Sequence, residues 1–486
     1  MSNGNVENVR LHRGVLGLLD IAAATMANIG PAMSFYFGFA FIAGTAGVAS
    51  PLVILLAGIA IALLGNTLSE FTKVLPSTGG FITFVGKTFG GRLGVTTALL
   101  TGAGYITAMA SVTAIVGGFF QFFLQYYNWP LKGTPWIVWT LVFLAIAVLL
   151  MVRGVHISTK VAGFFFAVEM GIMLIVATAA LIKYSGNINW APLNFNNLSL
   201  STLAPGFPLA IYLYIGWENS AALAEETENP RRNVPRAVYT SVLIMTVAYL
   251  YFAYATVIGF GGNITKLGEA AATIGSPFLG VAFGISTVLL AFAFVAGFTS
   301  TMGALIAGTN SQARLLFNAG REGLLPEWVG KVDAKRRTPV NALLMFLAIG
   351  MVVIGGWGLL HILGGSKSGQ MSAFNFFGYS STFGTILVLV VYALANVALP
   401  FYMKKHHADK FNALRHAVLP LVGVAVIALP LYYLTKPGQP QPFNWYPYAA
   451  LVAIVVSFIY ASVLVAKDKT VGDRVGTLVA DEDLVK

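Results

Sequence analysis

The chain contains no cysteine and few charged residues. Without cysteine it can form neither a disulfide framework nor a thiol site. Charged residues make up only 10% of the 486 residues, whereas hydrophobic residues make up 57% and the mean hydropathy is +0.78. Because a water-soluble globule needs a more polar surface than this composition can supply, a soluble protein is excluded. The sequence instead predicts a polytopic, all-α membrane protein.

Apolar runs of about 20 residues, each long enough to cross a ~30 Å hydrocarbon core, recur along the chain. No polar segment between them is long enough for a soluble domain. We therefore expect one membrane domain over residues 15–466, with short cytoplasmic tails at 1–14 and 467–486. Its twelve predicted transmembrane helices span 15–47, 50–75, 92–127, 135–153, 159–184, 204–226, 236–261, 278–316, 339–363, 373–401, 415–435 and 444–466.

Basic residues outnumber acidic ones by 29 to 18, which in a soluble protein could indicate a nucleic-acid partner. Here the predicted topology explains the excess. Only five basic residues fall in the predicted outside loops: Lys132, Lys183, Lys266, Lys367 and Lys436. The bias follows the positive-inside rule and predicts both termini in the cytoplasm. We expect membrane lipid around the chain, no nucleic-acid partner and no obligatory protein partner.

Two predicted helices, the first and the sixth, are interrupted at residues 26–32 and 213–219. Irregular backbone at membrane depth persists only where protein buries it or where it lines a polar cavity. Broken helices at matching places in two halves of a chain are typical of inverted-repeat secondary transporters, which bind their substrate near the midplane. We therefore predict a 5+5 repeat, residues 15–184 and 204–401, with two additional helices over 415–466.

Three loop strings, at residues 76–80, 225–236 and 313–339, carry the most distinctive sequence, together with Ile215-Gly216-Trp217-Glu218. In this order they resemble the amino acid-polyamine-organocation (APC) superfamily, over approximately residues 14 to 470. The resemblance implies a leucine-transporter-like fold, alternating access, and substrates that are amino acids, polyamines or related amines. A bacterial plasma (inner) membrane is the location that it implies.

The first interruption offers main-chain groups to a small charged solute. A half-helix ending near Ala27 directs carbonyls at the gap, and one starting near Pro31 directs amides there. A zwitterion fits both. Proline has no N–H, so one donor expected from the family's Gly-Ser-Gly-Ile pattern is missing, and the putrescine importers of the superfamily resemble this chain in that respect. Pro31 also simply suits a first helical turn. The predicted substrate-binding residues here are Asn28, Ile29, Gly30, Ala32 and Met33.

Aromatic residues accompany the second interruption. A ring face attracts an ammonium group by about 0.5 to 2 kcal/mol. The resemblance to arginine-agmatine exchangers implies a gating aromatic at Tyr212, whereas lipid-facing packing is the alternative. The predicted binding residues are Tyr105, Tyr212, Ile215, Gly216 and Trp217.

Two acidic residues, Glu169 and Glu218, lie within predicted spans. A charged residue at the bilayer centre costs about 2.5 to 3.5 kcal/mol, so each should face the bundle interior. Several relatives place lysine at the position of Glu169, and relatives use the glutamate at Glu218 in proton-sensitive gating. We predict ion-coupling roles for both residues; the alternatives are a satisfied structural acid at Glu169 and a helix-dipole partner at Glu218.

Residues 296–301 resemble the eighth-helix half of the sodium site in leucine-transporter-fold symporters. This implies a Na⁺ site whose ligands come from Ala27, Ile29, Ala296, Thr299 and Ser300. The alternative is that small and hydroxylated residues allow close helix packing. We expect no other cofactor.

These observations together predict a secondary active transporter that imports an amino acid, coupled to H⁺ or Na⁺. The alternative is an importer or exchanger of putrescine, another polyamine or a different small amine. A channel is less favoured because opposed broken helices suit alternating access. An intramembrane enzyme is less favoured because no nucleophile, base and metal set converges in the sequence.

Overall fold

The computed structural model describes residues 14–363 and 372–468 and is built of helices. The predicted tails and Lys367 lie largely or wholly outside the described residues. The helices of the described part are α1 Leu18–Ile29, α2 Pro31–Ala46, α3 Ser50–Val74, α4 Phe81–Phe89, α5 Gly91–Tyr126, α6 Trp136–Val152, α7 Val155–Lys183, α8 Leu200–Tyr212, α9 Asn219–Ala222, α10 Pro230–Gly259, α11 Ile264–Ile274, α12 Pro277–Ile285, α13 Thr287–Arg321, α14 Val340–Leu363, α15 Ala373–His406, α16 Leu419–Thr435 and α17 Tyr446–Lys467.

Helices that can cross a membrane dominate this architecture. Within the described residues nine helical stretches are long and apolar enough, or ten if the bent pair α11 and α12 is one span. The chain is therefore an all-helical, multi-pass membrane protein, while the number of twelve crossings stays a prediction. The first candidate stretch, Leu18–Val74, includes the three helices α1, α2 and α3, and α6 is shorter than the candidate stretches, with 17 residues.

The predicted eighth span, 278–316, divides into two helices in the structure. Gly275 adopts φ +76°, and Pro277, which lacks an N–H, starts α12 at 91° to α11. The Ser286 hydroxyl then accepts from the Leu289 N–H and caps a separate helix, α13. A segment predicted to be an outside loop thus contains the helix α11.

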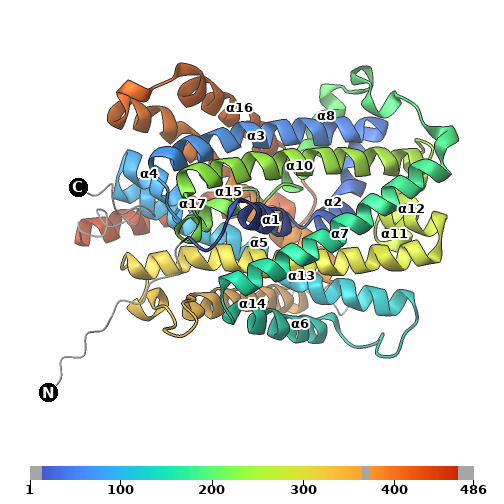
Figure 1. Ribbon diagram of the computed structural model, residues 1–486, viewed down its shortest axis with the longest axis horizontal. Coiled ribbons are helices and arrows are strands. Elements are labelled where there is room, and N and C mark those ends of the chain that lie inside the picture. The colour runs from blue at the N-terminus through green and yellow to red at the C-terminus, as the bar shows by residue number, and fades with distance from the viewer. Residues whose placement is uncertain (1–13, 364–371, 469–486) are drawn as a thin grey trace.

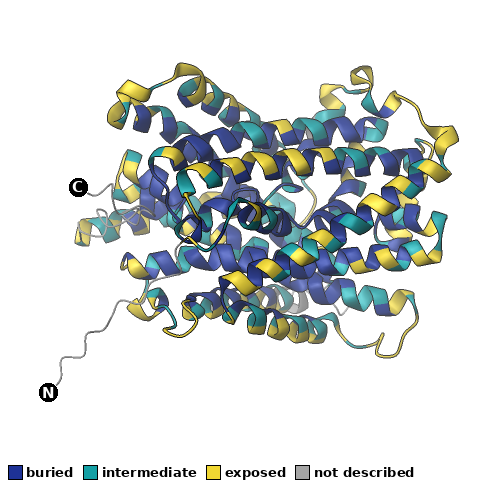
Figure 2. Ribbon diagram, viewed as in Figure 1, coloured by how far each residue is buried: buried dark blue, intermediate teal, exposed yellow. Residues whose placement is uncertain are grey.

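The interrupted helices lie inside the bundle. α1 occupies the centre of the view in Figure 1, where it packs against α7, α10 and α13. Buried residues concentrate in this interior, whereas exposed ones lie on outward faces and in loops (Figure 2). Large apolar side chains such as Leu149 on α6 and Val456 on α17 are exposed. Such exposed apolar faces suit contact with lipid.

Candidate functional site

The first interruption is one residue wide. α1 ends at Ile29, Gly30 adopts φ +61°, and Pro31 begins α2. The half-helix predicted to end near Ala27 therefore continues for two more residues. A Cβ at Gly30 would lie 3.1 Å from the Ala304 Cβ, so both the backbone conformation and the space favour glycine. Gly30 alone thus separates α1 from α2.

The second interruption is wider. α8 ends at Tyr212 and α9 begins at Asn219, with turns between them. Gly216 adopts φ +105°, and its carbonyl accepts from the Asn28 side-chain amide at 3.4 Å. A Cβ at Gly216 would lie 2.7 Å from that amide nitrogen. The two interruptions, 188 residues apart in sequence, thus touch each other.

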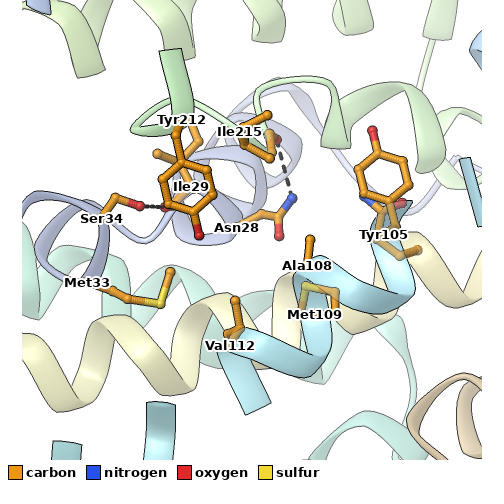
Figure 3. Close-up of a pocket in the computed structure, with 12 residues that line it drawn as sticks. Asn28, Ile29, Met33, Ser34, Tyr105, Ala108, Met109, Val112, Tyr212 and Ile215 are labelled. Atoms are coloured by element: carbon orange, nitrogen blue, oxygen red, sulfur yellow. Dashed lines mark hydrogen bonds between the residues drawn. The ribbon is translucent and has the colours of Figure 1, made fainter. Parts of the chain in front are cut away.

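A pocket lies between them (Figure 3). Tyr212, Asn28 and Tyr105 reach toward it from α8, α1 and α5. Of the predicted binding residues, Gly30, Ala32 and Trp217 do not line it. None of the twelve described residues that line it is charged: Asn28, Ile29, Met33, Ser34, Tyr105, Ala108, Met109, Val112, Tyr212, Ile215, Gly216 and Gln312.

Sequence reasoning missed five of these residues. Ala108, Met109 and Val112 follow Tyr105 by three, four and seven positions, so helical spacing places all four on one face and could have identified them. Ser34 follows α2's start and donates to the Ile29 carbonyl at 2.7 Å. The fifth, Gln312, could have been identified because its amide side chain lies in an apolar helix, where the structure shows it to be buried.

Protein groups close the first interruption. The Ala32 N–H donates to Glu169 Oε2 at 3.0 Å, and the Met33 N–H donates to Ser300 Oγ at 2.9 Å. The next amide, of Ser34, donates to the Gly30 carbonyl at 2.8 Å. Glu169 is 0% exposed, and its Oε1 has no hydrogen-bond partner within residues 14–363 and 372–468. A buried carboxyl group thus sits at the N-terminal end of α2, the positive end of the helix dipole.

The residues of the predicted sodium site come from α1 and α13, two helices that pack against each other. The Thr299 hydroxyl donates to the carbonyls of Val295 and Ala296 at 3.0 and 3.1 Å, within its own helix. The Ile29 carbonyl accepts from Ser34, and Ala27 is fully buried. The Thr299 hydroxyl and the carbonyls of Ala296 and Ile29 thus already take part in hydrogen bonds within the protein. The Na⁺ site therefore stays a prediction.

Buried polar atoms gather at the second interruption. Tyr105 donates to Glu218 Oε1, and both residues, with Gln312 and Asn219, line a second hollow that reaches Thr78. Several buried atoms here have no hydrogen-bond partner in the described part of the chain: Trp217 Nε1, Glu218 Oε2, Asn219 Oδ1 and Nδ2, and Ser220 Oγ. Trp217 itself packs on Tyr392, with ring centroids 5.6 Å apart. Because such atoms are usually satisfied by water or ligand, this region has capacity to bind polar groups.

The three loop strings meet beyond this hollow. Arg314, 2% exposed, forms an ion pair with Glu226, 1% exposed, and also donates to the Asn310 carbonyl. Arg321 pairs with Glu225 at 3.1 Å. Thr78 donates to Glu225 at 2.9 Å and accepts from Asn318 at 2.8 Å. The sequence strings thus serve one network that closes this end of the bundle.

The start of the described chain joins the same network. The N–H groups of Val15 and Leu16 donate to the Glu226 carbonyl at 2.9 and 3.0 Å, and the Glu228 N–H donates to the Leu16 carbonyl at 2.9 Å. α1 begins two residues after Leu16. The segment that follows the second interruption is therefore held against the segment that leads into the first.

A helical membrane protein in which two interrupted helices enclose a small buried pocket belongs to the class of membrane transporters. The family model for amino acid permeases matches residues 21–470. The chain therefore belongs to the amino acid permease family of the APC superfamily, whose members are transporters and not enzymes.

Curated relatives agree with this assignment. The uncharacterized amino acid permease YecA of Bacillus subtilis (strain 168) is 26% identical over 66% of this chain and 72% of its own length. The methylthioribose transporter of Bacillus subtilis is 24% identical over 86% of each chain. The b(0,+)-type amino acid transporter 1 of Mus musculus is 26% identical over 61% of this chain and 56% of its own.

A solved structure supports the fold. A crystal structure of a mutant of the Eremococcus coleocola manganese transporter superposes with a TM-score of 0.59, over 95% of this chain and 99% of that one, at 13% identity. At this identity the likeness concerns the fold alone. The fold is leucine-transporter-like, as the loop strings led us to expect.

Proposed function

We propose that this chain is a secondary active transporter that imports a small amine-bearing solute, an amino acid or a related amine, by alternating access. The observation that carries the proposal is the pocket formed where the two interruptions touch, at Asn28 and Gly216. The predicted inverted repeat supports alternating access, because a pocket between two opposed bundles can open to either side as they rock.

The chemistry of the pocket supports an amine. The carbonyl end of α1 carries partial negative charge, and the rings of Tyr105 and Tyr212 offer faces to a cation. Met33, Met109 and Val112 supply an apolar wall. The relatives named as amino acid transporters support the same class. The methylthioribose transporter adds an uncharged sugar as a second candidate, which the absence of charge on the described pocket lining favours.

For coupling, we favour H⁺ and Glu218. Its carboxylate accepts from Tyr105, which also lines the substrate pocket, so a solute that moves Tyr105 changes the surroundings of the carboxylate. The second oxygen is buried and unpartnered within the described residues, and the hollow around it reaches Thr78. Glu169 lies outside the pocket lining, and its predicted coupling role ranks second.

For orientation, we place the ion-pair network of Arg314 and Glu226 at the cytoplasmic side of the plasma membrane. The distribution of basic residues supports this placement, because the loops that supply the network hold most of the arginines. Both termini would then be cytoplasmic. In this conformation the network closes the inner side.

The decisive experiment is uptake by the purified protein in liposomes, with H⁺ and Na⁺ gradients imposed separately. Leucine, alanine, arginine, putrescine and methylthioribose serve as solutes. We expect saturable uptake that an inward H⁺ gradient drives above equilibrium, and about tenfold less accumulation in Glu218→Gln, the equivalent of about 1.4 kcal/mol. Glu269→Gln, an exposed acid on α11, is the matched control and should leave accumulation unchanged.

Two results would contradict the proposal. Non-saturating flux at high turnover would indicate a pore, and accumulation driven by Na⁺ alone would move coupling to the predicted sodium site.

A further inference from the structure

We propose that Glu169 occupies the place that a solute carboxylate would otherwise take, so that the pocket accepts amines and neutral solutes and discriminates against their carboxylate-bearing counterparts. This inference rests on the proposed transport function and narrows its substrate class. It assigns to Glu169 a role in specificity, in addition to any role in coupling.

The first step concerns the N-terminus of α2. A helix N-terminus binds anions because its first amides lack acceptors within the helix. In α2 the first residue, Pro31, has no N–H, and the next two amides donate to Glu169 and Ser300. The donors that would bind a solute carboxylate are therefore already engaged by side chains from α7 and α13.

The second step concerns the group that fills that place. Glu169 comes from a helix 137 residues away in sequence and is fully buried. Its Oε2 accepts the Ala32 N–H at 3.0 Å, so the carboxyl group stands where a solute carboxylate would accept the same hydrogen bond. Two groups cannot share this position, and a solute carboxylate is therefore excluded from it.

The third step concerns the pocket itself. Met33 and Ser34, the residues that follow Ala32, line it, so α2's start adjoins the solute. None of its described lining residues is cationic, so a solute carboxylate finds no countercharge. An ammonium group finds the α1 carbonyl end and two tyrosine rings. The pocket is thus complementary to a solute that has lost its carboxylate.

The first test compares matched pairs on the wild-type protein. Each pair is an amino acid and the amine formed by its decarboxylation: leucine with 3-methylbutylamine, phenylalanine with 2-phenylethylamine, and ornithine with putrescine. Binding is measured by the ligand-dependent rise in melting temperature. We expect the amine to bind about tenfold more tightly or better in every pair that binds, since charge-assisted hydrogen bonds are worth this much. An amino acid that binds as tightly as its amine overturns the inference.

The second test does not depend on knowing the substrate. Glu169→Ala frees the Ala32 amide and empties the carboxylate position, so millimolar acetate or formate should raise the melting temperature of this variant relative to chloride. Glu169→Gln keeps an acceptor of the same size, and neither it nor the wild type should respond. If Glu169→Ala does not fold, Glu169→Ser is the replacement, because its short side chain also leaves room.

Equal responses of all variants, or none in the folded Ala or Ser variant, would overturn the inference. A wild-type protein that transports none of the solutes would contradict the proposed function instead. The response of the variants to acetate would still decide the role of Glu169.

Discussion

The two interruptions differ in how their polar groups are used. At the first, the amides that start α2 donate to Glu169, Ser300 and the Gly30 carbonyl. At the second, side-chain atoms of four consecutive residues, 217–220, are buried without a partner among the described residues. An unpaired buried polar group costs about 1 to 3 kcal/mol. At the first break the main-chain amides are therefore paired within the protein, although Glu169 Oε1 has no partner among the described residues, whereas at the second break a cluster of side-chain atoms needs water or a bound solute.

The difference suggests that the two breaks have separate roles within one site. The first break, whose amides are paired, gives a fixed surface against which a solute is positioned. The second break provides the unpaired side-chain groups that respond to the solute. Its wider gap, six residues between α8 and α9 against one between α1 and α2, agrees with this view. Substitutions at or near each break test the comparison.

The largest effect should come from breaking the buried ion pair between Arg314 and Glu226, which follows the second break in the chain. In Arg314→Ala, Glu226 is left as a buried charge without its partner, so we expect a loss of about 3 to 5 kcal/mol in unfolding free energy. Lys331→Ala is the control, because Lys331 and Glu327 are 61% and 89% exposed and such pairs are worth about 0 to 1 kcal/mol. Thermal unfolding in detergent measures both. Similar losses in the two variants would mean that the network does not hold this end.

The next largest effect should come from adding a methyl group at Gly216, where the two breaks touch. Gly216→Ala places a methyl group 2.7 Å from the Asn28 amide nitrogen at a φ of +105°, so we expect solute affinity to fall by about 2 kcal/mol or more. Gly171→Ala on α7 has no heavy atom within 4 Å of the added carbon and should bind as the wild type does. Ligand-dependent melting curves give both affinities. Retained affinity in Gly216→Ala would show that the breaks need not touch.

A smaller effect is expected when the Glu169 carboxyl group is replaced by an amide. Glu169→Gln keeps an oxygen acceptor for the Ala32 N–H, so we expect a loss of only about 0.5 to 1.5 kcal/mol of unfolding free energy. Equilibrium unfolding measures the change. No loss at all, or a gain, would contradict the view that this carboxylate stabilises the start of α2.

The smallest effect is expected at the predicted sodium site. The Thr299 hydroxyl donates to carbonyls of its own helix, so Thr299→Val, which preserves the shape, should change the unfolding free energy by less than about 1 kcal/mol. Uptake should remain independent of Na⁺ in both proteins. Sodium-dependent uptake that disappears in Thr299→Val would show that the hydroxyl binds the cation instead.

Much of this site could be predicted because its signals are local. Gly30-Pro31 and Gly216 mark backbone that a continuous helix does not accommodate, and the loop strings mark their network before its contacts are known. The α11 and α12 bend was equally readable from Gly275-Ser276-Pro277, although we assigned those residues to a loop.

The remainder depends on contacts between distant helices. Nothing near Glu169 in the sequence reveals that it meets the Ala32 amide, because the contact is set by how α7 packs on α2. Trp217 was predicted to bind substrate yet lies outside the pocket lining, against Tyr392. Its direction could not be inferred because the turn between α8 and α9 has no helical period from which to read a face.

The short backbone ladder between residues 15–16 and 226–228 has a mechanical consequence. Its hydrogen bonds connect the segment that precedes α1 to the segment that follows α9. Neither segment can move outward until these hydrogen bonds break. Opening this end of the bundle would require these hydrogen bonds to break together, which makes the opening an abrupt event rather than a gradual one.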